Sequence, residues 1–377
     1  MRGCRGGRTR ANKQRRTITM TIIHRYLTRE LLKYFSIVLA SVVGIYLTVD
    51  FFGRIDDFLE AKLPLSMALE FFLLKVPLIV GQVMPVGVLL AVLIVFGLMV
   101  RSNEILALKS GGVSVRTLIK PVCAMGLVCS VLLFLLSEVL VPVTTAKSNE
   151  IWRSEVKGES AVSSRKKNIW IRGDHSIHHV TYFNFSDKTI FGVTLNYFDK
   201  DFRLIRRLDA HKGVYMEEGW HLFDVLEQSL VDGNGGYDVT CKNDTLARLE
   251  FGPEDLRRVA KKPEEMSYGE LSAYIGEVED QGYDATSHKV DLKAKTAYPL
   301  VCLIMSVLGV GLALWQQRRE GFAANVFYGI VLAFLYWTLH SFCLSLGYGE
   351  LLPPIVASWI ANSVFACFGI FLLLHAD

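Results

Sequence analysis

The sequence lacks the short motifs that mark a protein with its own energy source or hydrolytic site. It has no GxxxxGK[ST] loop to cradle a nucleotide phosphate, no HExxH zinc motif and no GxSxG nucleophile motif. It also has no CxxC or Cys/His spacing of the kind that binds a metal. If the protein performs transport, it must therefore use an ion gradient or an ATPase on another chain.

Disulfide bonds are also excluded as the element that stabilises the polar middle of the chain. Of seven cysteines, only Cys241 lies in the polar insert at residues 144–290. One cysteine cannot form a bond within that insert, and cysteines in apolar runs behave as small apolar side chains. The insert must therefore fold around its own core.

Long apolar runs dominate the rest of the chain. The 377 residues are 51% hydrophobic, with a mean hydropathy of +0.32. A run of roughly 20 apolar residues is enough to cross about 30 Å of hydrocarbon. The predicted membrane spans are residues 32–55, 67–100, 117–143, 293–315, 322–346 and 353–374. Pro77 and Pro85 predict a kink or a tilt in the long second span.

The distribution of Lys and Arg predicts the topology. Residues 1–33 carry ten Lys or Arg against one acid, Glu30, and basic side chains are again in excess at 101–120 and 316–321. The stretches 54–66 and 346–354 show no such excess. The positive-inside rule therefore places both termini in the cytoplasm and the insert outside.

Residues 1–21 are a basic tail without the apolar core of a signal peptide. We expect a disordered tail or a start codon assigned too early, and we favour Met20 as the true start. Residues 22–143 then hold the first three spans, and residues 291–377 the last three.

The insert begins with a predicted β domain at residues 144–265. Strand-sized runs rich in Ile, Val, Thr and aromatic residues alternate with turn signals about every ten residues, which is typical of a sandwich or jelly roll. Its densest titratable cluster is "GDHSIHH", with Asp174, His175, His178 and His179. Strand alternation separates His178 from the other two histidines, which favours an exposed polar strand face over a metal site.

Residues 266–290 are predicted to form an amphipathic helix that links the β domain to the fourth span. Ser267 and Glu270 have the spacing of a capping box. Apolar side chains from Leu271 onward recur at helical spacing, and Gly282 is placed to end the helix. This helix is expected to lie at the membrane surface.

The stretch "VRSNEILALKSGGVSV", residues 100–115, is a short polar elbow between the second and third spans. Ser102 is a candidate N-cap, Glu104 would lie in the first helical turn, and Gly111 or Gly112 can end the helix. Such a helix can transmit rigid-body motion from a separate ATPase to the two spans it joins. The alternative is an ordinary amphipathic turn.

Four charged residues lie within or next to the spans: Asp50, Glu70, Lys75 and Glu138. All four lie toward the predicted outer ends of the spans, and none lies at the bilayer midplane. Proton-coupled transporters place acids near the midplane. This placement predicts a polar vestibule that opens outward rather than a proton relay.

Several phrases of the sequence resemble the LptF/LptG family of lipopolysaccharide export permeases. "IIHRYLTRELLKYF" resembles the opening helix of the family and "RSNEILALKSGG" its coupling helix, whereas "SEVLVP" and "KTAYPL" resemble the exit of the third span and the entry of the fourth. The order of these phrases, and the layout of three spans, a β domain and three spans, match from about Ile22 to the C-terminus. "VDFFGRIDDFL", "GWHLFDV" and "GYGELLPP" favour the LptG-like side.

The resemblance implies a non-enzymatic permease of an ABC transporter in the bacterial inner membrane, with a periplasmic β domain. Its expected partners are an LptB-like ATPase dimer, a second, LptF-like permease, and LptC-like and LptA-like periplasmic proteins. No cofactor is expected on this chain, since the ATPase would hydrolyse ATP with Mg. The expected coupling residues are Ser102, Glu104, Ile105, Leu108 and Gly112.

The resemblance also suggests where lipopolysaccharide would bind. The candidates are Arg54, Lys62 and Lys75, as cations for the phosphates, and His340 on the fifth span. Asp50 stands where the family often has a lysine, so a structural ion pair between Asp50 and Lys75 is the alternative for both residues. For His340, a hydrogen-bonded polar residue of the interior is the favoured interpretation over a contact with the lipid.

Two other functions fit parts of the pattern. A membrane protein that transmits motion from an ATPase could regulate a periplasmic partner without moving lipid. An apolar groove in the β domain would favour lipid passage, and a filled core would favour this second function. A membrane-embedded enzyme is disfavoured because the enzyme motifs above are missing.

Overall fold

The computed structural model describes residues 5–156, 169–173, 175–184, 187–216, 219–231, 236–247, 249, 251–253, 262–280, 282, 284–315 and 322–375. The chain divides into two compact units. The first unit comprises Met1–Gly53, Lys75–Thr144 and Thr286–Asp377, and the second comprises Arg54–Leu74 and Thr145–Ala285.

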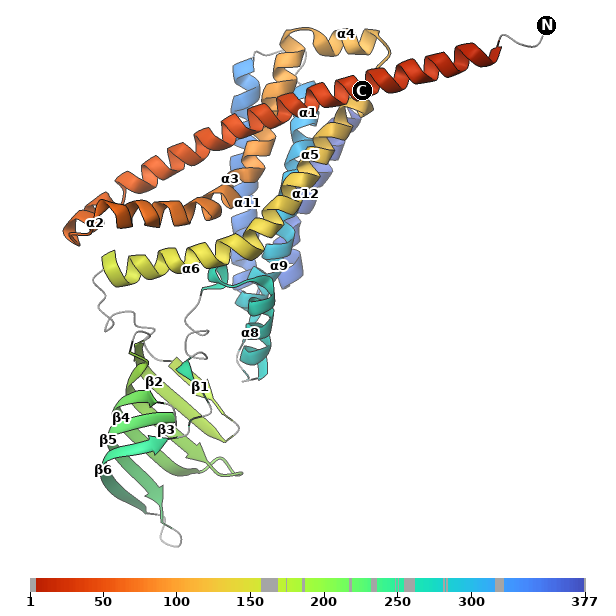
Figure 1. The fold of residues 1–377 in the computed structure, drawn as a ribbon. Helices are drawn as coiled ribbons and strands as arrows, with labels where there is room; N and C mark the ends of the chain where they lie inside the picture. Colours follow the sequence, from red (N-terminus) through yellow and green to blue (C-terminus); the bar gives the residue numbers. More distant parts are fainter. Residues whose placement is uncertain are drawn as a thin grey trace. The chain divides into compact units, whose positions relative to one another are not determined.

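The first unit is a bundle of long apolar helices (Figure 1). It contains α1 (Arg5–Phe52), most of α3 (Leu65–Arg101), α4 (Glu104–Ser110), α5 (Val115–Leu135), the π-turn η1 (Leu136–Leu140), α9 (Thr286–Ala297), the 3₁₀ turn η4 (Tyr298–Leu300), α10 (Val301–Trp315), α11 (Phe322–Tyr348) and α12 (Pro354–Leu374). Six helices are long and apolar enough to cross a membrane: Ile22–Phe52, Leu65–Arg101, Thr117–Ile151, Thr286–Trp315, Ala324–Tyr348 and Pro354–Leu374. This finding confirms the predicted helical membrane part.

Small residues let α10 pack closely against its neighbours. A Cβ atom at Gly309 would lie 2.9 Å from Cβ of Val92, and one at Gly126 would lie 2.4 Å from Oγ of Ser306. Helices in a bilayer associate largely through close packing, which small residues permit. These contacts hold α10 between α3, α5 and α12 in the centre of the bundle.

Two helix boundaries differ from the sequence-based expectation. Helix α1 begins at Arg5, within the tail expected to be disordered, and no glycine or proline interrupts it between Gly7 and Gly44. The linking helix expected at 266–290 is instead α8 (Tyr268–Asp280), and α9 starts afresh at Thr286.

The start of α8 confirms the predicted capping box. The Ser267 backbone N–H donates to Glu270 Oε2 at 3.1 Å, and the Glu270 N–H donates to Ser267 Oγ at 3.2 Å. Gly282 follows the helix with a φ of +77°, a conformation that favours glycine. The linking segment is therefore an amphipathic helix, as predicted, with a break before the fourth span.

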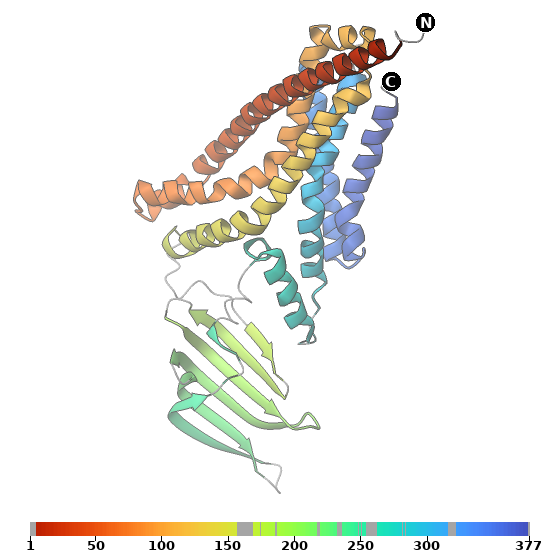
Figure 2. The same ribbon diagram turned by 45° about the vertical axis from the view of Figure 1, so that its right-hand side comes forward.

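The second unit contains a single six-stranded antiparallel sheet (Figures 1 and 2). Its strands are β1 (Ile169–Arg172), β2 (Ser176–Asn184), β3 (Thr189–Phe198), β4 (Leu204–Met216), β5 (Gly219–Leu230) and β6 (Tyr237–Ala247). Each strand pairs with the next along the chain. The inserted β domain is therefore confirmed, but the described residues form one meander, and the jelly-roll label stays unconfirmed.

The helical elements of the second unit include an aromatic cluster formed by α2 (Ile55–Glu60), α3 and the π-turn η2 (Trp152–Val156). The helical elements are α2, the first turns of α3, α6 (Val141–Ile151) from Thr145 onward, η2, the 3₁₀ turn η3 (Pro263–Glu265) and α8. The ring of Phe58 lies 5.4 Å from that of Phe71 and 5.9 Å from that of Trp152.

A bend crosses the sheet and breaks the simple alternation of buried and exposed residues. In three strands the buried positions jump by three residues, from Ile190 to Val193, Ala210 to Gly213 and Leu222 to Val225, and on β2 the adjacent residues Tyr182 and Phe183 are both buried. The bend runs through Gly192 and Asp224, whose φ angles are +61° and +55°. The residues at the bend drop out of the pairing without a shift in register, and both halves of each apolar pattern then face the same side. We call this side the inner face.

His178 corrects one sequence-based interpretation. It was expected on an exposed polar strand face, yet it is only 1% exposed on the inner face, opposite Leu195. Its Nδ1 finds no hydrogen-bond partner among the described residues. Asp174 lies outside the described residues. Among the described residues, no group of three or more His, Cys, Asp or Glu side chains could hold a metal ion.

We expect the sheet to lose stability as the pH falls from 7 to 5. Burial lowers the pKa of His178 from 6.5 to about 4, so the unfolded chain takes up a proton in this range before the folded sheet does. The contribution of neutral His178 to the free energy of unfolding is complete above pH 6.5 and is lost as the pH falls toward 4. At pH 5 about 2 kcal/mol of this free energy is lost.

Hydrogen exchange of the β2 and β3 amides in the purified full chain would measure this loss. His178→Phe should remove most of the pH dependence, whereas His211→Phe, at an exposed position on β4, should keep it. The same pH dependence in all three proteins would contradict this role of His178.

Candidate functional site at the elbow

The elbow folds into a short helix with a well-defined end. Helix α4 ends in a Schellman arrangement, in which the Gly112 N–H donates to Lys109 O and the Val113 N–H to Leu108 O, both at 3.0 Å. Gly112 has a φ of +78°, which explains why glycine is needed there. The predicted helix and its glycine stop are therefore present.

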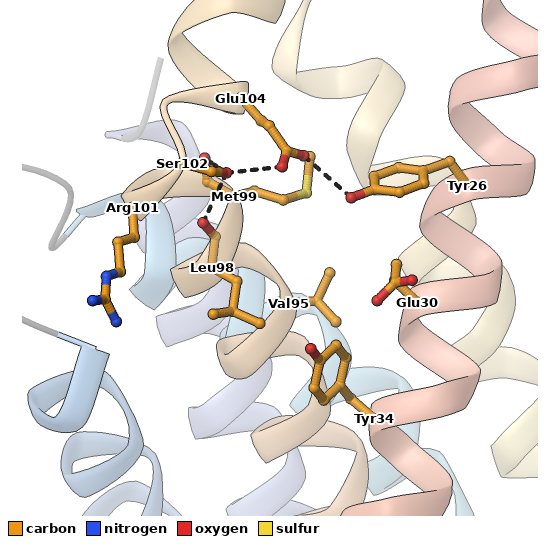
Figure 3. Close-up of a pocket in the computed structure, with 9 residues that line it drawn as sticks. All are labelled: Tyr26, Glu30, Tyr34, Val95, Leu98, Met99, Arg101, Ser102 and Glu104. Atoms are coloured by element: carbon orange, nitrogen blue, oxygen red, sulfur yellow. Dashed lines mark hydrogen bonds between the residues drawn. The ribbon is translucent and has the colours of Figure 1, made fainter.

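The start of α4 differs from the prediction. The residue at the N-cap position is Asn103, with a left-handed φ of 60° and no side-chain capping bond. Asparagine tolerates this conformation better than most residues. Ser102, the predicted cap, instead places its hydroxyl 2.8 Å from Glu104 Oε1 and 3.0 Å from the carbonyl oxygen of Leu98 (Figure 3). Ser102 therefore orients Glu104 rather than capping the helix.

The apolar side chains of α4 divide between two roles. Ile105 is fully buried in the core of the helical bundle, and Leu108 packs against that core. These two residues fix α4 to the bundle, so Ile105 cannot itself contact another chain. Leu106 is 64% exposed and was not singled out from the sequence. It is the apolar side chain that α4 offers to its surroundings.

Glu104 faces a pocket between α1 and the end of α3. The pocket has a volume of about 470 Å³ and is lined by Tyr26, Glu30, Tyr34, Val95, Leu98, Met99, Arg101, Ser102 and Glu104 (Figure 3). The hydroxyl of Tyr26 donates a long hydrogen bond of 3.4 Å to Glu104 Oε2. Glu104 is thereby linked to the first span as well as to the end of the second.

The sequence analysis did not predict that α1 lines one side of this pocket. Tyr26, Glu30 and Tyr34 are spaced four residues apart, so they share one face of α1. The one sign of this face in the sequence was Glu30, the single acid among the basic residues of "IIHRYLTRELLKYF". Nothing in the sequence placed that face beside Glu104. The pocket lining carries two carboxylates, two phenols and the Arg101 guanidinium, so it offers both hydrogen-bond acceptors and donors to a polar partner.

Lys75 and Asp50 form an ion pair within the first unit. Lys75 Nζ lies 2.5 Å from Asp50 Oδ2, and the two side chains are 16% and 14% exposed. The ion pair between Asp50 and Lys75, which the sequence suggested as the alternative to phosphate binding by Lys75, is present. The pair joins α1, near its C-terminal end, to α3.

The other candidate lipid-binding residues lie in different surroundings. The Arg54 guanidinium stacks over the Trp152 ring at 4.5 Å, and Lys62 is exposed just after α2 with a φ of 54°. Both belong to the second unit, whereas Lys75 and His340 belong to the first.

His340 lies in the interior of the helical bundle. It is 7% exposed and stacks on Tyr336, with ring centroids 5.6 Å apart and an angle of 11° between the rings. Its Nδ1 has no hydrogen-bond partner among the described residues. The expected hydrogen bond is thus not found at this nitrogen, and aromatic packing on Tyr336 and Tyr298 holds the ring.

Comparison with known protein families gives a match over most of the chain. Residues 25–375 match the family described as lipopolysaccharide export system permease LptF/LptG. The match includes the elbow, the whole sheet and all six apolar helices. The first few residues of the first helix are the one part of these elements outside the match. No curated protein matches the chain.

Proposed function

Because the chain belongs to the LptF/LptG family of lipopolysaccharide export system permeases, we propose that it is the LptG-like permease subunit of an ATP-driven exporter. In this role it extracts lipopolysaccharide from the inner membrane and passes it to a periplasmic bridge. The observation that carries the proposal is the family match over nearly the whole chain. The family is one of multi-pass inner-membrane transport proteins and not of enzymes.

The proposed partners follow from this role. An LptB-like ATPase dimer binds ATP and Mg and docks at the elbow, and a second, LptF-like permease completes the membrane cavity. LptC-like and LptA-like proteins form the bridge. Both termini and the elbow face the cytoplasm, and the β domain faces the periplasm.

The geometry of α4 supports docking of the ATPase at the elbow. Its core-facing residue Ile105 anchors the helix, while Leu106 and the Glu104 pocket are open to a partner. A force applied to α4 would reach α3 and α5 through the chain, and α1 through Tyr26. Rigid elements that share packed contacts move together.

The last strand supports the transfer to a bridge. β6 pairs with β5 on one side, and its side chains are exposed along most of its length. An edge strand offers backbone N–H and C=O groups to a strand of another chain. Lys75, Arg54 and Lys62 remain the proposed cations for the lipid phosphates, and we leave out His340 because it is buried.

One observation favours the alternative function, in which the chain transmits motion without moving lipid. The inner face of the sheet is covered, since Ile190, Leu195 and Leu222 are fully buried. A closed interior fits a signalling domain unless the interior can open.

Purification of the chain from native membranes tests the proposal. We expect an ATPase and a second permease to purify with it, and we expect ATP hydrolysis to require that ATPase. ATP hydrolysis by the chain alone would contradict the proposal. In a Ser110→Cys variant, which places a cysteine in the elbow, labelling from the periplasmic side only would also contradict it. Lipid that enters the inner face of the sheet would exclude the signalling alternative.

A further inference from the structure

Phe251, which follows β6, covers part of the inner face of the sheet. Its side chain is 4% exposed and belongs to the same buried cluster as Val180 and Leu222. Its ring lies 5.7 Å from that of His178 on β2 and 6.0 Å from that of Trp220 on β5. One side chain thus reaches across the interior between strands that are three apart in the sheet.

Phe251 is held differently from the strand residues around it. It lies outside the strand ladders, in a described segment of three residues, 251–253. The buried Trp220 Nε1–H donates to the carbonyl oxygen of Phe251 at 2.9 Å. The inner-face residues of β2 to β5, by contrast, lie in strands that pair with a neighbouring strand on both sides. Phe251 can therefore leave the interior without breaking the sheet.

The space that Phe251 fills has the character of a site for a hydrocarbon chain. Its walls are aliphatic and aromatic, and the one titratable side chain in ring contact with Phe251, His178, is neutral near pH 7 because burial lowers its pKa to about 4. Exchange of a phenyl ring for a flexible acyl chain would keep the interior dry and filled. The exchange loses little packing, which allows it to be reversible.

We propose that Phe251 is an exchangeable occupant of an acyl-chain site on the inner face of the sheet, and that the Trp220 Nε1–H bond is its latch. An acyl chain of an amphiphile displaces the ring, and the ring returns when the chain leaves. The inference rests on the proposed function, because that function supplies the amphiphile. It adds a way for a closed interior to admit lipid.

A photoreactive fatty acid tests the proposal in the full chain in detergent. Stearic acid with a diazirine group is the probe, and mass spectrometry locates the labelled peptides. Phe251→Ala should raise labelling of the β2 and β5 peptides around His178 and Trp220. Trp220→Phe keeps an aromatic ring but removes the donor. It should raise labelling about fivefold, the effect of one lost neutral hydrogen bond.

Phe202→Ala is the matched control, since Phe202 belongs to the same unit and is 63% exposed. It should leave the labelling unchanged. If Phe251→Ala disrupts the sheet by hydrogen exchange, the result with Trp220→Phe decides. Unchanged labelling in Trp220→Phe, or an equal rise in Phe202→Ala, would overturn the proposal.

This outcome is separable from that of the proposed function. Fatty-acid labelling needs neither ATP nor partners, so increased labelling without ATP-driven delivery of lipopolysaccharide would support the site and reject the export role. Equal ATP-driven delivery in wild type, Phe251→Ala and Trp220→Phe would support export and reject the latch.

Discussion

Replacing Glu104 with alanine should release the ATPase from the detergent-solubilised chain. Glu104 supplies the carboxylate at the start of α4 and is oriented by Ser102 and Tyr26. Loss of one partner of a charged, hydrogen-bonded interface pair costs about 2–5 kcal/mol, so the amount of co-purified ATPase should fall at least about tenfold. Lipopolysaccharide export should fall with it.

The fold should survive this substitution, because Ile105 and the Schellman end of α4 do not depend on Glu104. Glu60→Ala is the matched control, as Glu60 is an exposed acid at the end of α2. Normal recovery of the ATPase with Glu104→Ala would remove the assignment of Glu104 to coupling. An equal loss in Glu60→Ala would show a general effect of charge.

Asp50→Asn and Lys75→Ala should shift the lipopolysaccharide dependence of ATPase activity in opposite directions. Asp50 is the ion-pair partner of Lys75, so if Lys75 binds a lipid phosphate, Asp50 competes with that phosphate for Lys75 Nζ. A hydrogen bond to a charged group contributes about 1.5–3 kcal/mol, so removal of the competing carboxylate should lower the half-saturating lipid concentration about tenfold or more. Lys75→Ala should raise that concentration.

The double variant Asp50→Asn/Lys75→Met separates binding from folding. Removal of one member of a buried ion pair leaves an uncompensated charge, whereas removal of both does not. If Lys75 binds phosphate, the double variant should behave like Lys75→Ala. If both single variants lose activity equally and the double variant recovers it, the pair is purely structural and Lys75 does not bind lipid.

The sequence predicted the features that depend on local patterns. Apolar length located the helices that can span a membrane, capping-box spacing located the start of α8, and the glycine pair located the end of α4. Each of these features is set by residues within a few positions of one another, which is why pattern alone was sufficient.

The features that were missed depend on contacts between distant segments. Tyr26 and Glu104 are 78 residues apart, and only the packing of α1 beside α3 brings them together. His178 was assigned to an exposed face because strict alternation ignores which side of the sheet is covered, and Phe251 covers it. The bend through Gly192 and Asp224 likewise follows from three-dimensional fit rather than from any local signal.

We propose that a separate ATPase drives lipopolysaccharide through this chain into the sheet. The most direct test reconstitutes the chain with its co-purified ATPase and second permease in proteoliposomes that contain lipopolysaccharide. A photo-crosslinking residue replaces Tyr197, an aromatic side chain that packs against the buried cluster of the inner face. We predict lipopolysaccharide crosslinks at this position that require both ATP and the ATPase. Crosslinks that form equally without ATP, or none in a complex that hydrolyses ATP, would contradict the account.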